Sequence, residues 1–540
     1  MSTETIQLYD ATLRDGMQGE GMSLSAEEKL RVAHALDQLG VPLIEAGFPE
    51  SNPKERELFE LLAAERFENA EIAAFGMTRR RDVEASNDPA LVLLAASVAP
   101  ICTIVGKTWR LHLDKLVKVD AAENLRMIGE SVAFLRAAGK RVIYDAEHFF
   151  DSFRADPAYA ITCLEAAAEA GAETVVLCDT NGSSLPFQVA AATGAAVAAL
   201  APVRIGIHCH NDAECGVANT LAAVEVGARQ VQGTVNGIGE RTGNANLISI
   251  IANLQLKMGF ECLSQEQMTR LTETAHFVDE LLNVSSNPHQ PYVGRHAFAH
   301  KGGMHVAGVS AETSLYEHVE PAVIGNEREL VVSELAGRAS MLEKAADLGL
   351  DLDSAAVARS LARVKQLEHE GYQFEAADGS LELLLRRETG EHQPLFELKS
   401  WRVVVESDAS GETSTRATIK IRVGDRSLER NASGNGPVNA LDAALRSAIV
   451  EVFPHLSEIE LVNYKVRILD AAKGTDAVTR VLIDASDGHE VWGTIGVSEN
   501  VIVASWQALV DSLECGMLPS RLRQPPSGGL SSPGSLGVAT

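Results

Sequence analysis

The chain has 540 residues, of which 46% are hydrophobic and 22% charged, and its formal net charge is −27. This length predicts more than one domain, and the composition is that of a globular protein, which argues against wholesale disorder. The acidic balance disfavours nucleic acid and anionic membranes as partners. The sequence contains no run of about eighteen uncharged apolar residues, so no membrane span is predicted.

Seven cysteines are scattered along the sequence without a Cys-x-x-Cys pair. This spacing favours a reducing compartment over a disulfide framework. The first residues carry no basic and apolar leader. We therefore expect a cytoplasmic protein.

From residue 5 to about 260, short apolar runs alternate with helical patterns. The expected strands are Ile6–Tyr9, Leu43–Gly47, Ile72–Phe75, Ser97–Val105, Arg141–Asp145, Thr174–Cys178, Val203–His208 and Gln230–Val235. Ser25 and Glu28 predict a capping box at the start of the first helix, and Gly40 predicts its end. Eight strands alternating with helices predict an α/β protein with a (β/α)₈ TIM barrel. A doubly wound sheet is the alternative, but no Gly-x-Gly-x-x-Gly follows the first strand.

The rest of the chain divides into a helical part and a strand-rich part. The segment Asn283–Gly303 interrupts the helical part, and we expect a linker or an ordered functional loop there, because nothing in it can form a core. From Leu398 onward, three strands and a helix are expected twice in succession, which predicts an internally repeated domain. The expected domains are the barrel over 1–282, a helical linker subdomain over 283–392, a βββα-repeat regulatory domain over 393–516 and a disordered tail over 517–540.

Two polar strings, Leu13–Gln18 and Ile207–Asp212, each follow an expected strand. His208 and His210 project to the same side of their strand. Together with Asp15 they offer two imidazoles and a carboxylate, a ligand set that suits a catalytic divalent metal better than a closed structural zinc. Other polar residues also follow the carboxyl ends of the expected strands, where barrel active sites are built. They include Glu45, Glu147, Thr180 and Asn236–Asn244.

Three motifs resemble signatures of the isopropylmalate, homocitrate and citramalate synthase family. Leu13–Gln18 with Lys29 resembles the first signature, His208–Asp212 resembles the second, and Asn236–Asn244 resembles the glycine-rich loop after the eighth strand. The resemblance extends over nearly the whole chain up to the tail. It implies a metal-dependent condensing barrel followed by an amino-acid-sensing (LeuA-type) domain.

The resemblance implies roles for individual residues. The implied ligands of a divalent metal (Mg²⁺, Mn²⁺ or Zn²⁺) are Asp15, His208, His210 and Asn244. Arg14 is implied to stabilise the developing alkoxide of a keto substrate, and Glu45 resembles the acid that holds this arginine. Thr180 resembles the threonine that binds the substrate carboxylate.

Other implied roles concern the acetyl group. Glu147 matches an acidic position near the acyl group. Glu147 and His305 are the two candidates for the base that deprotonates the acetyl methyl. His305 and Tyr316 resemble a pair that completes a neighbouring subunit's site, which implies a homodimer with shared active sites. Glu214 stands where the family usually has glycine, so an extra carboxylate near the metal is expected to alter its affinity or the approach of CoA.

The segments Phe48–Pro53 and Ala299–Val306 are more similar to citramalate synthases than to isopropylmalate synthases. They imply acetyl-CoA and pyruvate as substrates, and citramalate as the first product of a route to isoleucine. Isopropylmalate or homocitrate synthase activity is the alternative within the family. A catalytically silent amino-acid sensor and an aldol-cleaving lyase are alternatives of other classes; the intact metal motif argues against the first, and the βββα pair disfavours the second.

The expected effector is isoleucine, bound by the repeated domain. Ser433–Pro437 and Gly496–Asn500, at the starts of the two expected helices, offer free backbone N–H groups that suit an amino acid's carboxylate.

Overall fold

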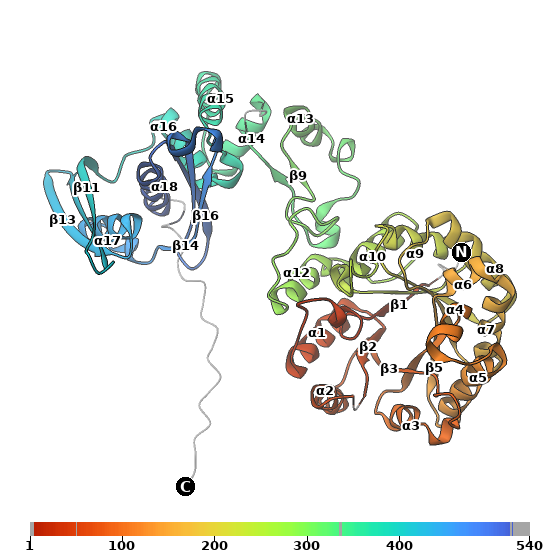
Figure 1. Ribbon diagram of the computed structural model, residues 1–540. Helices are drawn as coiled ribbons and strands as arrows, with labels where there is room; N and C mark the ends of the chain where they lie inside the picture. The colour runs from red at the N-terminus through yellow and green to blue at the C-terminus, as the bar shows by residue number, and fades with distance from the viewer. Residues whose placement is uncertain (1–4, 50, 334–336, 519–520, 522–540) are drawn as a thin grey trace, which may run out of the picture. The chain divides into compact units, whose positions relative to one another are not determined.

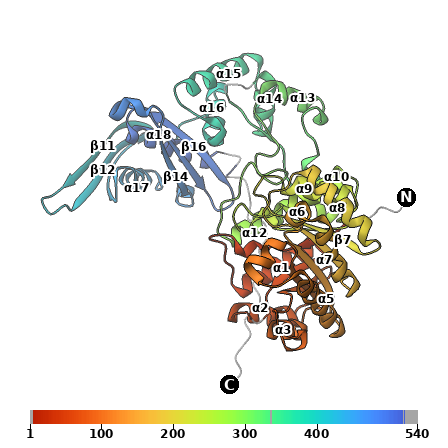
Figure 2. The same cartoon turned by 45° about the vertical axis from the view of Figure 1, so that its right-hand side comes forward.

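A computed structural model describes residues 5–49, 51–333, 337–518 and 521, and these form two compact units (Figures 1 and 2). The first unit runs to Phe298 and includes Glu317–Arg328, and the second comprises Ala299–Tyr316 and the residues from Glu329 onward. Most of the tail expected to be disordered lies outside the described residues. No described helix has the length and apolar character needed to cross a membrane.

Eight parallel strands close the first unit into a barrel in chain order, with β1 paired to β8 (Figure 1). They are β1 Gln7–Asp10, β2 Leu43–Gly47, β3 Glu71–Met77, β4 Ile101–Lys107, β5 Arg141–Glu147, β6 Thr174–Asp179, β7 Arg204–Cys209 and β8 Gln230–Gly233. The barrel prediction is thereby confirmed, and the doubly wound alternative is excluded for these strands. Strand β4 begins four residues later than expected, at Ile101, because Pro100 has no N–H to give to the ladder.

Helices cover the outside of the barrel. They are α1 Ala26–Leu39, α2 Pro53–Ala64, α3 Pro89–Ala96, α5 Ala121–Ala137, α6 Phe149–Ala155, α7 Pro157–Glu169, α8 Pro186–Leu200, α9 Gly216–Glu225, α10 Leu247–Leu256, α11 Gln265–Met268 and α12 Leu271–Leu281, with the short α4 Arg110–His112 after β4. The predicted capping box is present, because Ser25 accepts from the Glu28 N–H and Glu28 accepts from the Ser25 N–H. Gly40 ends α1 with φ +92°, a conformation that glycine adopts without strain.

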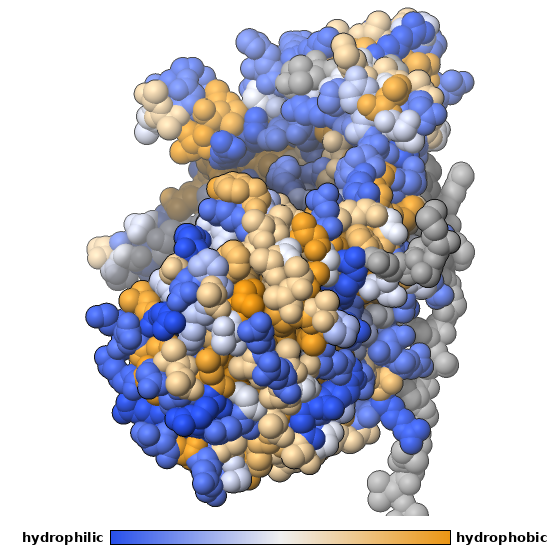
Figure 3. Space-filling model, turned by 90° about the vertical axis from the view of Figure 1, so that its right-hand side faces the viewer, coloured by the Kyte–Doolittle hydropathy of each residue, from blue (hydrophilic) through white to orange (hydrophobic). Residues whose placement is uncertain are grey.

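Strand residues enter two separate apolar layers, the inner of which draws on β1 to β6. Leu8 and Ile207 belong to the larger core between strands and helices, whereas Tyr9, Ile143 and Val176 pack inside the barrel. On the face of this unit shown in Figure 3, hydrophilic and hydrophobic residues are mixed, as on most folded domains.

Asp10, the last residue of β1, is fully buried, and its two carboxylate oxygens accept hydrogen bonds from the Thr12 N–H and hydroxyl. Burial raises the pKa of Asp10 from 3.8 to about 7. Between about pH 4 and pH 7 the folded state therefore binds one proton more than the unfolded chain, so the free energy of unfolding falls as the pH rises.

We expect Asp10→Asn to flatten this fall, by up to about 1.4 kcal/mol per pH unit, in denaturant unfolding at pH 5 and pH 8. Equal slopes for the two proteins would show that Asp10 is ionised in the fold.

The segment Asn283–Gly303 does contribute to a core, so the expectation that nothing in it could do so is wrong. Tyr292, Val293 and Phe298 are buried in the large barrel core. Gln290 also donates to the Asn236 side chain over 2.9 Å. The apolar residues are spaced irregularly, and periodicity therefore gave no sign of their burial.

The second unit begins with a helical part. A short parallel pair, β9 Ala299–His300 and β10 Glu329–Leu330, precedes most of its helices. The helices are α13 Gly303–Ala311, α14 Arg338–Asp347, α15 Ser354–His369 and α16 Asp378–Thr389. The last three share a core that includes Met341, Val364, Leu381 and Leu385.

Two βββα units follow, as predicted. The first is the antiparallel sheet β11 Glu397–Ser407, β12 Thr413–Val423 and β13 Arg426–Gly434 with helix α17 Pro437–Ile449; the second is β14 Glu460–Ile468, β15 Thr479–Ser486 and β16 Val491–Ser498 with α18 Val501–Gly516. Their two helices and sheets share one apolar core.

The starts of these two helices differ in their free N–H groups. The Asn500 side chain accepts from the N–H groups of Ile502 and Val503 at the start of α18. Within the two predicted segments, the N–H groups of Asn435, Val497 and Asn500 donate to Asn439, Gln507 and Ser498, so the expectation of free N–H groups is wrong for these three residues. Helix α17 begins after Gly436 without a side-chain cap.

Candidate active site

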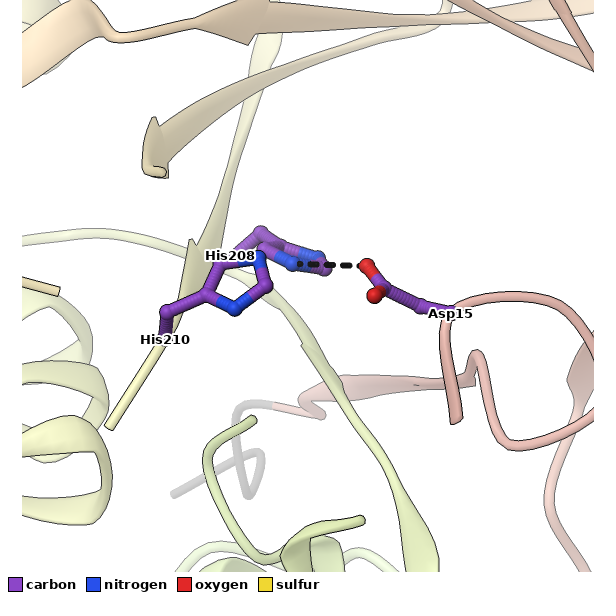
Figure 4. Close-up of side chains that lie close together, drawn as sticks. All are labelled: Asp15, His208 and His210. Carbon is purple, nitrogen blue, oxygen red and sulfur yellow. Dashed lines mark ion pairs between the residues drawn. The ribbon is translucent and has the colours of Figure 1, made fainter. Parts of the chain in front are cut away.

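Asp15, His208 and His210 come together at the carboxyl ends of the barrel strands (Figure 4). Asp15 lies in the loop after β1, His208 is on β7, and His210 follows that strand. One potential ligand atom from each residue lies within 4.8 Å of the others, and His208 Nε2 is 3.3 Å from an Asp15 oxygen. All three side chains are buried, and Cys209 between the histidines packs in the outer core.

Asn244 is held beside this group by its backbone, which forms an isolated bridge with His210. Its side-chain N–H₂ donates to the Ile238 carbonyl over 3.1 Å. The loop that carries it requires glycine, because Gly243 has φ +90° and a Cβ there would lie 1.9 Å from the Gly237 oxygen. The loop thus pairs the backbone of Asn244, whose side chain is buried, with that of His210.

Three buried atoms around this site have no hydrogen-bond partner among the described residues. They are one oxygen of Asp15, Nδ1 of His210 and the amide oxygen of Asn244. Unpaired buried acceptors are costly, and a divalent cation would satisfy all three at once. The residues present therefore fit a divalent metal.

Gln232 on β8 contacts the candidate ligand His208, a neighbour that we did not predict. Its amide N–H₂ donates to Asp145 over 3.3 Å, so its oxygen faces His208 Nδ1 at 2.9 Å. His208 Nδ1 then carries a proton, which makes Nε2, the nitrogen that faces Asp15, the candidate ligand atom. The available signal was the pair of glutamines, Gln230 and Gln232, on the same face of an otherwise apolar strand.

The charges of the site hold its carboxylate ionised. Burial by itself raises the pKa of Asp15, but the Arg14 guanidinium and the two histidines lower it far below its ordinary value. Burial and the neighbouring His208 lower the pKa of His210 to about 4, so this imidazole is neutral near pH 7. A neutral imidazole and an ionised carboxylate are the forms that bind a metal.

Arg14 is fixed by three neighbours. Its Nε is 2.5 Å from a Glu45 oxygen, its Nη1 is 3.2 Å from Asp15, and its guanidinium lies 3.8 Å from the centre of the Phe75 ring. Glu45 is fully buried and also accepts from the Tyr9 hydroxyl over 2.6 Å. The expected pairing of Glu45 with Arg14 is therefore present in the structure.

Glu147 ends β5, and Thr180 directly follows the neighbouring strand β6. Glu147, the last residue of β5, forms an ion pair with Lys107 at the end of β4. The Thr180 hydroxyl accepts from the His148 N–H over 2.9 Å. That bond uses a lone pair of the hydroxyl, so its proton remains available for donation to a substrate carboxylate.

His305 and Tyr316 belong to the second unit. Their rings stack with centres 4.2 Å apart, and Tyr316 is 39% exposed. The pair is thus preformed, and both residues are exposed.

Two other residues of the motifs have structural explanations. Glu214 is exposed with φ +57°, a backbone conformation that favours glycine, and it is not among the clustered ligand atoms of the described residues. Lys29 is buried and lies 2.5 Å from Glu55, so it joins α1 to α2.

A cavity of about 790 Å³ opens beside these groups. Its walls include Phe75, which lies under Arg14, and Lys107, which is paired with Glu147. Arg80 and Arg81, both largely exposed, also line it. The cavity therefore contacts the partners of two candidate catalytic residues and carries surface cations in a chain of net charge −27.

Comparison with known families gives three matches along the chain. Residues 5–278 match the HMGL-like family, residues 292–372 the homocitrate synthase post-HMGL domain-like family, and residues 375–517 the LeuA allosteric (dimerisation) domain.

Several relatives are similar over nearly their whole length. An (R)-citramalate synthase of Aquifex aeolicus (strain VF5) is 47% identical over 94% of this chain and 97% of its own. That of Synechocystis sp. (strain PCC 6803) is 46% identical over 95% of this chain and 96% of its own. A probable 2-isopropylmalate synthase of Methanopyrus kandleri is 33% identical over 94% of this chain and 97% of its own. The chain therefore belongs to the HMGL-like family of metal-dependent condensing enzymes that includes the (R)-citramalate and 2-isopropylmalate synthases.

Proposed function

We propose that this chain is an (R)-citramalate synthase, an acyltransferase that joins the acetyl group of acetyl-CoA to pyruvate and releases CoA. The observation that carries the proposal is the buried Asp15, His208 and His210 cluster beside Arg14, in a chain whose similar relatives include five (R)-citramalate synthases at 41–47% identity. An intact cluster of this kind has no use in a catalytically silent sensor.

Asp15, His208, His210 and Asn244 would hold the divalent metal, which is Mg²⁺, Mn²⁺ or Zn²⁺. When bound, the metal would act as a Lewis acid toward the keto oxygen of pyruvate. The Thr180 hydroxyl donates to the pyruvate carboxylate. Arg14, oriented by Glu45, donates to the keto oxygen as negative charge develops there, a form of stabilisation that is often the largest in an enzyme.

The other substrate needs a base. Glu147 and His305 are the candidates to take a proton from the methyl group of acetyl-CoA. The resulting carbanion attacks the keto carbon of pyruvate, and the new alkoxide takes up a proton. Water then cleaves the thioester, so the products are citramalate and CoA.

The 790 Å³ cavity is the proposed site of the CoA arm. Its apolar walls, including Phe48 and Leu94, suit the pantetheine chain, while Arg80 and Arg81 suit the phosphates. The thioester end would then lie near Lys107 and Glu147, which form the ion pair described above.

We expect Arg80→Gln and Arg81→Gln each to raise the KM for acetyl-CoA by about tenfold, because each removes a charge-assisted bond to phosphate. The KM for pyruvate and kcat should change little. Arg126→Gln, an exposed arginine on α5 that does not line the cavity, is the matched control. If the variant that carries both substitutions has an unchanged KM for acetyl-CoA, the CoA phosphates bind elsewhere.

We propose a homodimer in which His305 and Tyr316 complete the partner's active site. The matched LeuA allosteric (dimerisation) domain supports a dimer. Edge strand β14 also exposes Val462, Val466 and Ile468, an apolar row that another chain would cover.

The proposed domain limits are 282, 392 and 516, supported by the helices before Thr389 and the two sheets after Glu397. A cytoplasmic location is supported by seven cysteines that form no disulfide.

Isoleucine is the proposed effector, as the end product of the route that this reaction would begin. We expect saturating isoleucine to lower the apparent affinity for substrate by about 5- to 150-fold. It should therefore slow thiol release more than leucine does. Initial rates of the full-length enzyme with each amino acid measure this. A rate unaffected by millimolar isoleucine, leucine and valine would assign the repeated domain to dimerisation alone.

The proposed activity is tested by thiol release from acetyl-CoA with a panel of 2-keto acids, with and without a chelator. Pyruvate should be preferred, and chelation should stop the reaction. Preference for 2-oxoisovalerate would identify an isopropylmalate synthase, and preference for 2-oxoglutarate a homocitrate synthase. No release with any keto acid would overturn the enzymatic assignment.

A further inference from the structure

A second group of metal-binding side chains lies at the carboxyl ends of β4 and β5. His112 ends the short helix α4, Glu147 is the last residue of β5, and His148 follows it. One potential ligand atom from each lies within 4.8 Å of the others. The proposed reaction assigns no role to either histidine.

His148 is oriented by a carboxylate. Its Nδ1 is 3.0 Å from an Asp151 oxygen, which also accepts from the Asn181 amide over 2.9 Å. An ionised carboxylate can only accept, so Nδ1 donates and Nε2 is left as a ligand atom. A carboxylate behind a histidine in this way is the usual second layer of a metal site.

His112 brings an unsatisfied atom to the group. Its Nδ1 is buried and has no hydrogen-bond partner among the described residues. Its ring lies edge-to-face on His148, with centres 4.4 Å apart, and 5.5 Å from the ring of Trp109. Burial and the neighbouring His148 lower the pKa of His112, so protons compete little for this imidazole near pH 7.

We propose that His112, Glu147 and His148 form a second site for a divalent transition metal. Two imidazoles and a carboxylate suit a transition metal such as Zn²⁺, Co²⁺ or Ni²⁺. The Lys107 ammonium already pairs with Glu147 and repels an incoming cation. The second site is therefore weaker than the Asp15, His208 and His210 site and fills only when metal is in excess.

Metal bound at the second site would coordinate the Glu147 carboxylate, which could then no longer accept a proton from substrate. This consequence rests on the proposed function, in which Glu147 is a candidate base. Excess Zn²⁺ should then inhibit an enzyme that one equivalent activates. Metal binding itself is independent of the proposed reaction, so the two can be tested separately.

The test is titration of the metal-free, full-length protein with Co²⁺, followed by equilibrium dialysis and visible absorption. We expect two equivalents with distinct affinities. His112→Gln should weaken the second equivalent by about 100-fold and leave the first unchanged. His208→Ala should do the reverse, and His34→Ala, on the outer helix α1, should change neither. Lys107→Met should tighten the second equivalent, because it removes the competing ammonium.

Binding of only one equivalent to the wild-type protein would overturn the proposal. So would a second equivalent whose affinity is the same in His112→Gln and in wild type. Circular dichroism checks that each variant is folded. If His112→Gln does not fold, the Lys107→Met titration decides, and an unchanged second affinity there also overturns the site.

Discussion

His208→Ala is expected to abolish citramalate formation and to remove the tightly bound metal while leaving the fold intact. The substitution deletes one ligand of the proposed metal and leaves Asp15 with one partner fewer in a buried site. Thiol release measures activity, elemental analysis measures bound metal, and circular dichroism measures the fold.

Cys209→Ala is the matched control for this experiment. Cys209 is adjacent in sequence but packs in the outer core, away from the site. It should retain metal and most activity. Activity that persists in His208→Ala, or in wild-type protein stripped of metal, would contradict a metal-dependent reaction.

Arg14→Met is expected to lower kcat by about 10²- to 10³-fold, because it removes a donor aimed at the developing negative charge. It should also destabilise the protein by about 3–5 kcal/mol, because Glu45 is left buried without its cationic partner. Activity assays and denaturant unfolding measure the two losses.

The double variant Arg14→Met/Glu45→Gln separates these effects. Glutamine retains an acceptor for the Tyr9 hydroxyl and carries no charge, so most of the lost stability should return. Activity should stay low. Recovery of activity in the double variant would show that Arg14 serves only to neutralise Glu45.

The fold was largely predictable because each barrel strand is a short apolar run followed by a polar loop, and the helix limits carry local signals such as the Ser25 cap. The ligand group was predictable because the strand period places His208 and His210 on one side. Their approach to Asp15 depends on barrel closure, which brings β1 and β7 to opposite sides of β8.

The features that the sequence did not predict depend on contacts between residues far apart in the chain. The role of Gln232 follows from its position between His208 and Asp145, on two other strands, which no local pattern encodes. The burial of Tyr292 and Phe298 likewise follows from packing on the barrel. The capped start of α18 was a local misjudgement, since asparagine is a common helix cap and Asn500 was already visible in the sequence.

The division of the chain into two units has a consequence for active-site sharing. Ala299–Tyr316 belongs to the second unit, but the chain returns to the first unit at both of its ends, after Phe298 and before Glu317. The stacked rings of His305 and Tyr316 are thus carried on a segment that includes helix α13 and whose two ends both join the first unit. In the proposed dimer, each chain would lend His305 and Tyr316 to its partner on a segment whose two ends both join its own barrel unit. A dimer of this kind would need no exchange of whole domains.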